Sequence, residues 1–276
     1  MTTDAHKHAY NFLTPSEEKI TRAFLENGYV ITDIEDLDRL NALKERIANT
    51  AAEHLKVPLD ADPDVFLNNI HTQVSADDLN SLRLAVINDL KESETWFKES
   101  YFRMAKNAIS TLIGSEIAMQ RSVGLSVQLP DDSSSLLPLH TDVWDGDSPF
   151  EVVMWLPLVD CFQTKSMYLV PLNEDRLLQS KIDQNRTPDA ESLFKEVQEF
   201  AEFLEIPYGK ALLFSQTIMH GNRVNETDET RWTMNCRFKS LMSPYADKKL
   251  IETFEPITLK AATRIGMNYT QPKLNG

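Results

Sequence analysis

The spacing of apolar positions changes once along the chain, near residue 120. Before that point the pattern is mainly helical. Residues 14–17 (TPSE) form a capping box with proline at the first helical position, which predicts a helix that ends at Gly28. The β-rich stretch 29–34 predicts a strand. The apolar positions between 37 and 55 predict a long amphipathic helix, and we expect a further helix from about 94 to 114.

After residue 120 apolar and polar positions alternate, as in half-buried strands. We expect strands at 122–129, 151–158, 166–170, 210–216 and 231–241. Several short strands separated by turn residues are typical of an antiparallel sandwich or barrel. Apolar residues with helical spacing interrupt this series at 173–205 and predict a helical insertion. We expect this insertion to help cover a pocket as a lid.

The composition is that of an ordinary globular protein. The chain has 276 residues, 42% of them hydrophobic and 25% charged, and no Gly/Ser- or Pro-rich linker divides it. We therefore expect a single domain over residues 1–276. The formal net charge of −14 argues against nucleic acid as a partner, because binding phosphates needs a basic surface. A small anionic substrate stays compatible with this charge, since one pocket can be locally basic.

The cysteines and the N-terminus indicate the compartment. Cys161 and Cys236 are far apart and lack metal-ligand spacing, so we expect two buried thiols in a reducing cytosol. The N-terminal stretch MTTDAHKHAY lacks the apolar core of a signal peptide. No run approaches the roughly 18 apolar residues of a membrane span. We predict a soluble, cytoplasmic protein without a membrane partner; the sequence does not give its oligomeric state.

Four of the six histidines show no sign of chemistry. His6 and His8 stand in a polar N-terminus and are expected to be solvated. His54 lies near the end of a predicted helix, where a cation is favoured. For His71, in a loop-like stretch, we favour a structural role over a contact with substrate.

The other two histidines belong to a pattern with metal-ligand character. In an extended strand, His140 and Asp142 point to the same side and can converge on one ion. Two histidines and one carboxylate suit Fe(II) oxygenases, since they leave one face of an octahedron open. An isolated HxD is more often a surface polar pair. However, His220 follows the apolar stretch 211–214 and opens a polar turn, which favours a second ligand there.

Arg231 stands eleven residues after His220. A hairpin of that length would return the next strand beside the first and bring Arg231 near the metal. A guanidinium can bind a carboxylate through two parallel hydrogen bonds, which suits the distal carboxylate of 2-oxoglutarate. The alternative is a surface arginine paired with Asp228 or Glu229.

These spacings resemble the phytanoyl-CoA hydroxylase-like branch of the Fe(II)/2-oxoglutarate dioxygenases. Residues 24–31 (FLENGYVI) look like its F-x-x-x-G-Y-V entry, and 155–158 (WLPL) look like its central strand. Residues 167–171 (MYLVP) resemble a strand that usually continues into a PGSH turn, which this chain lacks. The resemblance implies a mainly β fold with flanking α: a double-stranded β-helix (jelly-roll) core over 121–241. A mostly helical part, 1–120, would precede it, and the insertion would occupy 173–205.

The resemblance also implies roles for individual residues. His140, Asp142 and His220 match the Fe(II) ligands, and Arg231 matches the residue that binds 2-oxoglutarate. Three further positions would face the same co-substrate pocket; they are Asn222, Gln128 and Trp155. A carboxylate at 142 speaks against the halogenase variant, in which a halide takes that ligand position.

Some charged and aromatic residues near these positions have two interpretations. Trp144, Asp145 and Asp147 follow the HxD motif and form either a substrate loop or a solvated acidic turn. Arg237 lies on the same strand face as Arg231, where it binds an anionic substrate group or a structural carboxylate. Two further basic residues carry less weight: Arg121 is a weaker candidate of the same kind, and Lys165 looks like solvated surface, as do the acidic runs near Glu35 and Asp77.

The function expected from this pattern is oxygenation with Fe(II), O₂ and 2-oxoglutarate, with release of succinate and CO₂. The polar strand that contains Gln128 and the acidic loop after His140 look similar to family members found in bacterial surface-carbohydrate and small-metabolite pathways. This resemblance implies a small polar metabolite that becomes hydroxylated. A sugar or sugar nucleotide comes first and an amino acid or other secondary metabolite second. Two alternatives remain. One is a metal-dependent cupin-type isomerase or hydrolase, which would be expected to show HxH with a glutamate; the other is a non-catalytic binding protein on the same barrel.

Overall fold

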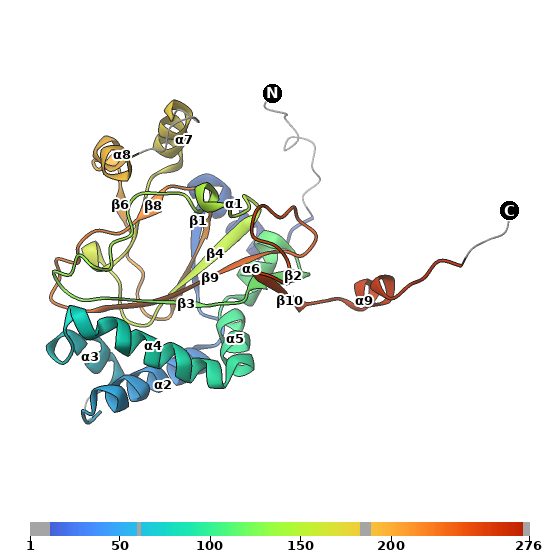
Figure 1. Cartoon of the computed structure of the whole chain (residues 1–276). Helices are drawn as coiled ribbons and strands as arrows, with labels where there is room; N and C mark the ends of the chain where they lie inside the picture. Colours follow the sequence, from blue (N-terminus) through green and yellow to red (C-terminus); the bar gives the residue numbers. More distant parts are fainter. Residues whose placement is uncertain (1–11, 60–61, 183–188, 273–276) are drawn as a thin grey trace.

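The computed structural model describes residues 12–59, 62–182 and 189–272. The expectations for His6, His8 and the N-terminal stretch lie outside these residues. Two antiparallel sheets form the centre of the molecule (Figure 1). The expectation of a mainly β core with flanking helices is confirmed.

The larger sheet has the strand order β1-β7-β4-β9-β2-β10, and β3 also pairs with β9. Its strands are β1 (Tyr29–Asp33), β2 (Ile117–Gln120), β3 (Gly124–Gln128), β4 (Glu151–Pro157), β7 (Lys210–Ser215), β9 (Arg231–Ser240) and β10 (Phe254–Thr258). Three of them, β1, β2 and β10, lie outside the range 121–241 that was expected to hold the core. The smaller sheet has the order β6-β5-β8 and consists of β6 (Glu202–Phe203), β5 (Tyr168–Leu169) and β8 (His220–Gly221).

The first helix, α1 (Pro15–Asn27), begins and ends where its sequence predicts. The Thr14 N–H donates to Glu17 Oε2 at 2.8 Å, and the Glu17 N–H donates back to Thr14 Oγ1 at 3.4 Å. Gly28 ends the helix at φ +80°, a left-handed conformation that favours glycine. The chain then enters β1 and pairs with β7, so the N-terminal part is fixed to the edge of the larger sheet.

The helices that follow depart from prediction at two places. They are α2 (Leu37–Leu55), α3 (Pro63–Asn68), α4 (Ala76–Glu92), α5 (Glu94–Arg103) and α6 (Lys106–Ile113). The single helix expected over 94–114 is wrong: Ala105, at φ −142°, separates α5 from α6. The break is stabilised by Glu35, whose N–H donates to the Met104 carbonyl and whose carboxylate accepts the Asn107 N–H. Glu35 is therefore not simply solvated surface.

Helix α4 was not predicted, although its buried residues Leu79, Leu82, Val86 and Leu90 have helical spacing. Together with α2, α3 and α5 it covers one face of the larger sheet (Figure 1). The even-numbered residues of β9, from Trp232 to Phe238, point into this helix-covered core. The odd-numbered residues point to the other face, toward the smaller sheet. Polar side chains of β9 therefore gather between the two sheets.

The helical insertion is confirmed in its described residues and contains α7 (Leu172–Lys181) and α8 (Ala190–Val197); its end is strand β6. Leu178, Leu193 and Val197 pack on Tyr168 of the smaller sheet and on Met219, which directly precedes β8. None of its described residues lines the cavity introduced below, so no contact supports the expected lid. Instead, the buried carboxylate of Asp175 accepts the Met219 N–H at 2.8 Å and fixes the residue before His220.

The remaining elements are short. Among the described residues they are the 3₁₀ turns η2 (Ile70–Thr72), η3 (Asp142–Asp145) and η4 (Gln163–Lys165), and helix α9 (Ala261–Met267). Cys161 and Cys236 are buried free thiols, as expected, and burial raises the pKa of each to about 12. Within the described ranges, no helix is long and apolar enough to cross a membrane.

Candidate metal centre

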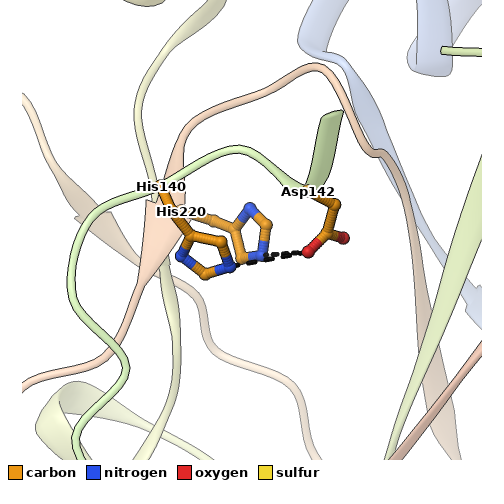
Figure 2. A group of neighbouring side chains, drawn as sticks. All are labelled: His140, Asp142 and His220. Atoms are coloured by element: carbon orange, nitrogen blue, oxygen red, sulfur yellow. Dashed lines mark ion pairs between the residues drawn. The ribbon is translucent and has the colours of Figure 1, made fainter. Parts of the chain in front are cut away.

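Backbone pairing brings two histidines together between the sheets. The His140 N–H donates to the His220 carbonyl at 3.1 Å, and the His220 N–H donates to the His140 carbonyl at 2.9 Å. The two imidazole rings consequently lie side by side, with their centroids 4.4 Å apart. The expectation of one extended strand through His140 and Asp142 is wrong beyond Thr141. Thr141 is extended, but Asp142 opens η3, and this turn directs its carboxylate toward the imidazoles (Figure 2).

The three side chains place their donor atoms around one point (Figure 2). Asp142 Oδ1 lies 3.5 Å from His140 Nε2 and 4.0 Å from His220 Nε2. All three donor atoms lie within 4.8 Å of one another. In the part of the chain that the structure describes, this is the one group of three such side chains with metal-site spacing. The sequence prediction of these three residues as a cluster agrees with this geometry.

Each imidazole is oriented by a backbone carbonyl. His140 Nδ1 lies 2.8 Å from the Pro138 carbonyl, and His220 Nδ1 lies 3.0 Å from the Ile218 carbonyl. Because a carbonyl oxygen can only accept, both Nδ1 atoms carry the proton. In a neutral ring this tautomer leaves the lone pair on Nε2, the atom that faces Asp142, as a metal ligand needs.

The electrostatics of the cluster also suit a cation. Burial, followed by the nearby His140, lowers the pKa of His220 to about 4, so its imidazole is neutral at pH 7. For His140 burial acts in the same direction and is the largest single effect, but the hydrogen bonds to Asp142 and to the Pro138 carbonyl, together with the charges of Asp142 and Asp145, outweigh it, and its pKa is raised. Burial opposes ionisation of Asp142, yet His140, His220 and Arg237 hold the pKa of its carboxyl well below the usual range. A buried carboxylate beside two imidazole Nε2 atoms is a donor set that fits Fe(II).

A cavity of about 750 Å³ opens onto the three donor side chains. Its walls come from α4, β3, the loop 134–137, η3 and the face of β9 that carries odd-numbered residues. Part of its lining is apolar, with Val153, Trp155, Met167 and Phe214, and the centroid of the Phe214 ring lies 4.8 Å from that of His220. Trp155 thus faces this cavity, in agreement with the sequence prediction.

Arg231 lies in the same cavity and is 4% exposed. Its Nη2 donates to Ser126 Oγ at 3.2 Å, whereas its buried Nε has no hydrogen-bond partner among the described residues. Burial lowers its pKa to about 10, so the guanidinium stays charged at pH 7. A charged group buried with an unsatisfied N–H costs free energy unless an anion binds it. The donor therefore points to an oxyanion ligand in the cavity.

Two expectations about Arg231 need correction. The hairpin that was expected to bring it near the metal does not form, because His220 lies in the smaller sheet and Arg231 in the larger one. The two residues meet across the cavity instead. The alternative surface ion pair is also absent from the described structure, since Glu229 pairs with Lys165 at 2.5 Å.

Lys165 itself was taken for solvated surface and is fully buried. Besides its ion pair with Glu229, its ammonium donates to Asn68 Oδ1 at 2.7 Å. The Thr230 N–H donates to the Asn68 carbonyl at 2.7 Å. These bonds connect α3 to the turn before β9 and fix the position from which Arg231 enters the cavity.

The other two predicted co-substrate residues are engaged by the protein. Gln128 pairs with Arg231 across β3 and β9 but does not line the cavity; its Nε2 donates to the Arg223 carbonyl at 2.8 Å. Asn222 lines the cavity, but its Oδ1 accepts the Leu137 N–H and its Nδ2 donates to the Ser135 carbonyl at 3.1 Å. Asn222, which directly follows β8, therefore holds the loop 134–137 in place through these two hydrogen bonds.

The residues proposed to bind substrate differ in whether they line the cavity and in whether protein groups already bind them. Arg237 faces the cavity, but its Nη2 lies 2.9 Å from Asp142 Oδ1, so the structure favours the structural-carboxylate interpretation. Asp147 is buried and forms ion pairs with Lys248 and, at 3.6 Å, with Arg237. Trp144 is 40% exposed and does not line the cavity, whereas Asp145 does.

The remaining candidates lie outside the cavity, and other residues that line it were not predicted. His71 Nδ1 contacts Thr230 Oγ1 at 3.1 Å, in keeping with the structural role favoured for it, and Arg121 lies away from the cavity. Sequence reasoning missed several polar residues that line it: Asn80, Arg83, Ser126 and Asn235. The helical spacing of α4 would have placed the first two on one face, but no motif marks them.

No protein-family model and no curated protein matches the sequence. Solved structures do match. A structure described as a non-heme monooxygenase, the ThoJ–Ni complex, has a TM-score of 0.53 at 14% identity, over 90% of this chain and 93% of the other. EctD from S. alaskensis with bound Fe has a TM-score of 0.52 at 17% identity, over 86% and 81%. The chain has the fold of the non-haem iron oxygenases.

A third match supports the same fold. The epimerase SnoN in complex with Fe³⁺, alpha ketoglutarate and nogalamycin RO has a TM-score of 0.52 at 16% identity, over 83% of this chain and 86% of the other. At such identities the oxygenase fold is what the likeness establishes. The expected jelly-roll fold is thereby confirmed.

Proposed function

We propose that this chain is an Fe(II)- and 2-oxoglutarate-dependent oxygenase. One observation carries the proposal: a buried guanidinium with an unsatisfied N–H, Arg231, lies in the same cavity as the donor cluster of His140, Asp142 and His220. A metal site alone would fit many activities. A metal site that shares its cavity with an unpaired buried cation fits a metal enzyme that uses an organic dianion. 2-Oxoglutarate is such a molecule.

The described residues divide into a metal part and a co-substrate part. His140, Asp142 and His220 would hold Fe(II) through two Nε2 atoms and Oδ1. Arg231 would bind the distal carboxylate of 2-oxoglutarate, with Ser126 orienting the guanidinium. When bound, iron together with 2-oxoglutarate supplies the activation of O₂ that oxygenation requires.

The protein's own contribution is orientation and exclusion of water. One wall of the cavity is apolar and consists of Val153, Trp155, Met167 and Phe214, of which Phe214 packs against His220. In such surroundings the attraction between Arg231 and a carboxylate is much stronger than in water. Two carbonyl contacts hold a proton on Nδ1 of each histidine, so Nε2 is the nitrogen that each ring offers to a metal.

We propose a small polar metabolite as primary substrate, hydroxylated with release of succinate and CO₂. A sugar or sugar nucleotide stays the first candidate and an amino acid the second. A cavity of about 750 Å³ accommodates 2-oxoglutarate and a molecule of this size together. Among the similar structures, EctD has been solved with 2-oxoglutarate and 5-hydroxyectoine, a small organic molecule. Membership of the phytanoyl-CoA hydroxylase-like branch is part of the proposal.

Two wider features belong to the same proposal. Helices α2–α5 share one core with strands of the larger sheet, which supports a single domain. The buried free thiols suit a reducing compartment, which supports a cytoplasmic location.

The test is turnover of 2-oxoglutarate. Protein loaded with Fe(II) under argon is given 2-oxoglutarate and then O₂, and succinate is measured with and without a pool of small metabolites. We expect succinate only when Fe(II), O₂ and 2-oxoglutarate are all present, and none from His140→Ala. Metabolite conversion that needs Zn(II) but neither O₂ nor 2-oxoglutarate would favour the hydrolase or isomerase alternative.

A further inference from the structure

The rim of the cavity carries a second guanidinium without a carboxylate partner. Arg83 is half-buried on α4 and lines the cavity. Its Nη2 donates to Asn80 Oδ1 at 2.8 Å, and Asn80 also lines the cavity. The two residues are three positions apart, so both stand on the face of α4 that borders the opening. The bond to Asn80 keeps the guanidinium at this rim.

Most of the described arginines form an ion pair with an acidic side chain. Asp89, two turns further along α4, binds Arg46 at 2.6 Å, and Glu191 binds Arg223 at 2.9 Å. Arg83 forms no such pair with any described residue, although the chain carries a formal net charge of −14. Only one of its five N–H groups is used by Asn80, which leaves donors free for a ligand.

The remaining rim residues limit where a negative charge can bind. Asp145 also lines the cavity, only three residues after Asp142, and its charge acts on His140. A further anionic group is therefore disfavoured on that side and favoured beside α4. Leu136 and Leu137, 37% and 49% exposed, add apolar surface to the opening. The rim thus offers an oxyanion site together with contacts for a less polar part of a molecule.

We propose that Arg83, oriented by Asn80, binds a carboxylate or phosphate group of the primary substrate. This proposal rests on the proposed function, because it names the class of molecule that enters beside 2-oxoglutarate. Arg231 and Arg83 then have separate tasks: the buried arginine binds the co-substrate, and the rim arginine selects an anionic substrate. A neutral sugar is disfavoured, and a sugar phosphate or an amino-acid derivative with a free carboxylate is favoured.

The experiment uses the full chain loaded with Ni(II) and 2-oxoglutarate, so that no turnover occurs. Two pairs of probes are titrated by calorimetry. N-acetylleucine is compared with its neutral amide, and glucose 1-phosphate is compared with methyl glucoside. Each titration is repeated with Arg83→Gln and with Arg121→Gln, which removes the same charge away from the cavity. Binding of 2-oxoglutarate is measured in all three proteins.

We expect one anionic probe to bind at least tenfold more tightly than its neutral counterpart, and Arg83→Gln to remove this preference. Arg121→Gln is expected to keep it. The carboxylate and phosphate pairs show which oxyanion is preferred. The proposal is overturned if anionic and neutral probes bind equally, or if Arg83→Gln binds the preferred anion like the wild type. If the wild type does not bind 2-oxoglutarate, the result counts against the proposed function itself.

Discussion

Arg237 Nη2 lies 2.9 Å from Asp142 Oδ1, the same oxygen that faces both imidazoles. The guanidinium is held in turn by Gln216 Oε1, which accepts from Nε at 3.0 Å, and by Gln120 Oε1, which accepts from Nη1 at 3.3 Å. Arg237 therefore acts on the carboxylate oxygen that belongs to the donor cluster. It is a positioning residue: it fixes which oxygen of Asp142 faces the donor cluster.

Arg237→Lys is expected to weaken Fe(II) binding by about 10- to 100-fold, as loss of a group that orients a metal ligand typically does. Lysine keeps the positive charge but cannot contact Asp142, Gln216 and Gln120 at once. Anaerobic calorimetry with Fe(II) measures the change, with Arg121→Lys as a control for a surface substitution. Wild-type affinity in Arg237→Lys would show that Asp142 needs no such support.

The hydrogen bonds continue from Gln216 to Glu151, a buried carboxyl group on β4. Burial, with the nearby Asp147, raises the pKa of Glu151 from 4.5 to about 7, despite the bond from the Ser148 N–H. The folded protein thus holds this proton more tightly than the unfolded chain. Its stability contribution is fully present below about pH 4.5 and is lost as the pH rises through 7.

Glu151→Gln removes this titration, so its free energy of unfolding is expected to vary less between pH 5 and 8 than that of the wild type. A shift from 4.5 to about 7 corresponds to roughly 3 kcal/mol. Urea unfolding at several pH values measures the difference, and Glu252→Gln on the surface serves as the control. Parallel pH profiles for Glu151→Gln and the wild type would contradict the raised pKa.

His140→Ala and His220→Ala are each expected to lower Fe(II) affinity by about two orders of magnitude or more, because each removes one of three donors. Circular dichroism checks that both variants fold. His71→Ala is the matched control, since His71 contacts Thr230 and lies outside the cavity. If either ligand variant retained full affinity, the metal assignment would be wrong.

The donor cluster could be predicted because two of its members are close in sequence and because all three are residue types that bind metals. His140 and Asp142 are two residues apart, and few other histidines compete for the second position. The route to the geometry was not predictable. His140 pairs with His220 through an isolated bridge to β8 that exists only in the folded chain, and Arg231 reaches the same cavity from the larger sheet.

The misses have a common physical cause: a charged residue does not reveal its partner. The sequence suggests that Lys165 lies on the surface, but its ion pair with Glu229 and its hydrogen bond to Asn68 offset the cost of burying its charge. Arg237 reads as a substrate contact until Asp142 is seen beside it. Gln128 was predicted to face the co-substrate pocket, but its side chain donates to the Arg223 carbonyl and does not line the cavity. Helix α4, by contrast, had a readable apolar pattern in its buried leucines.

The central claim, that the chain binds Fe(II) and 2-oxoglutarate in one cavity, is tested most directly by an anaerobic titration. Protein loaded with Fe(II) is titrated with 2-oxoglutarate, and the weak visible charge-transfer absorption of the chelate is followed. We expect a saturable band in the wild type and in Arg83→Gln. Loss of one partner of a buried charge pair costs about 2–5 kcal/mol, so Arg231→Ala should need about 30-fold more 2-oxoglutarate or worse, and Arg231→Lys should lie between. No band in the iron-loaded wild type, or an unchanged titration in Arg231→Ala, would contradict the account.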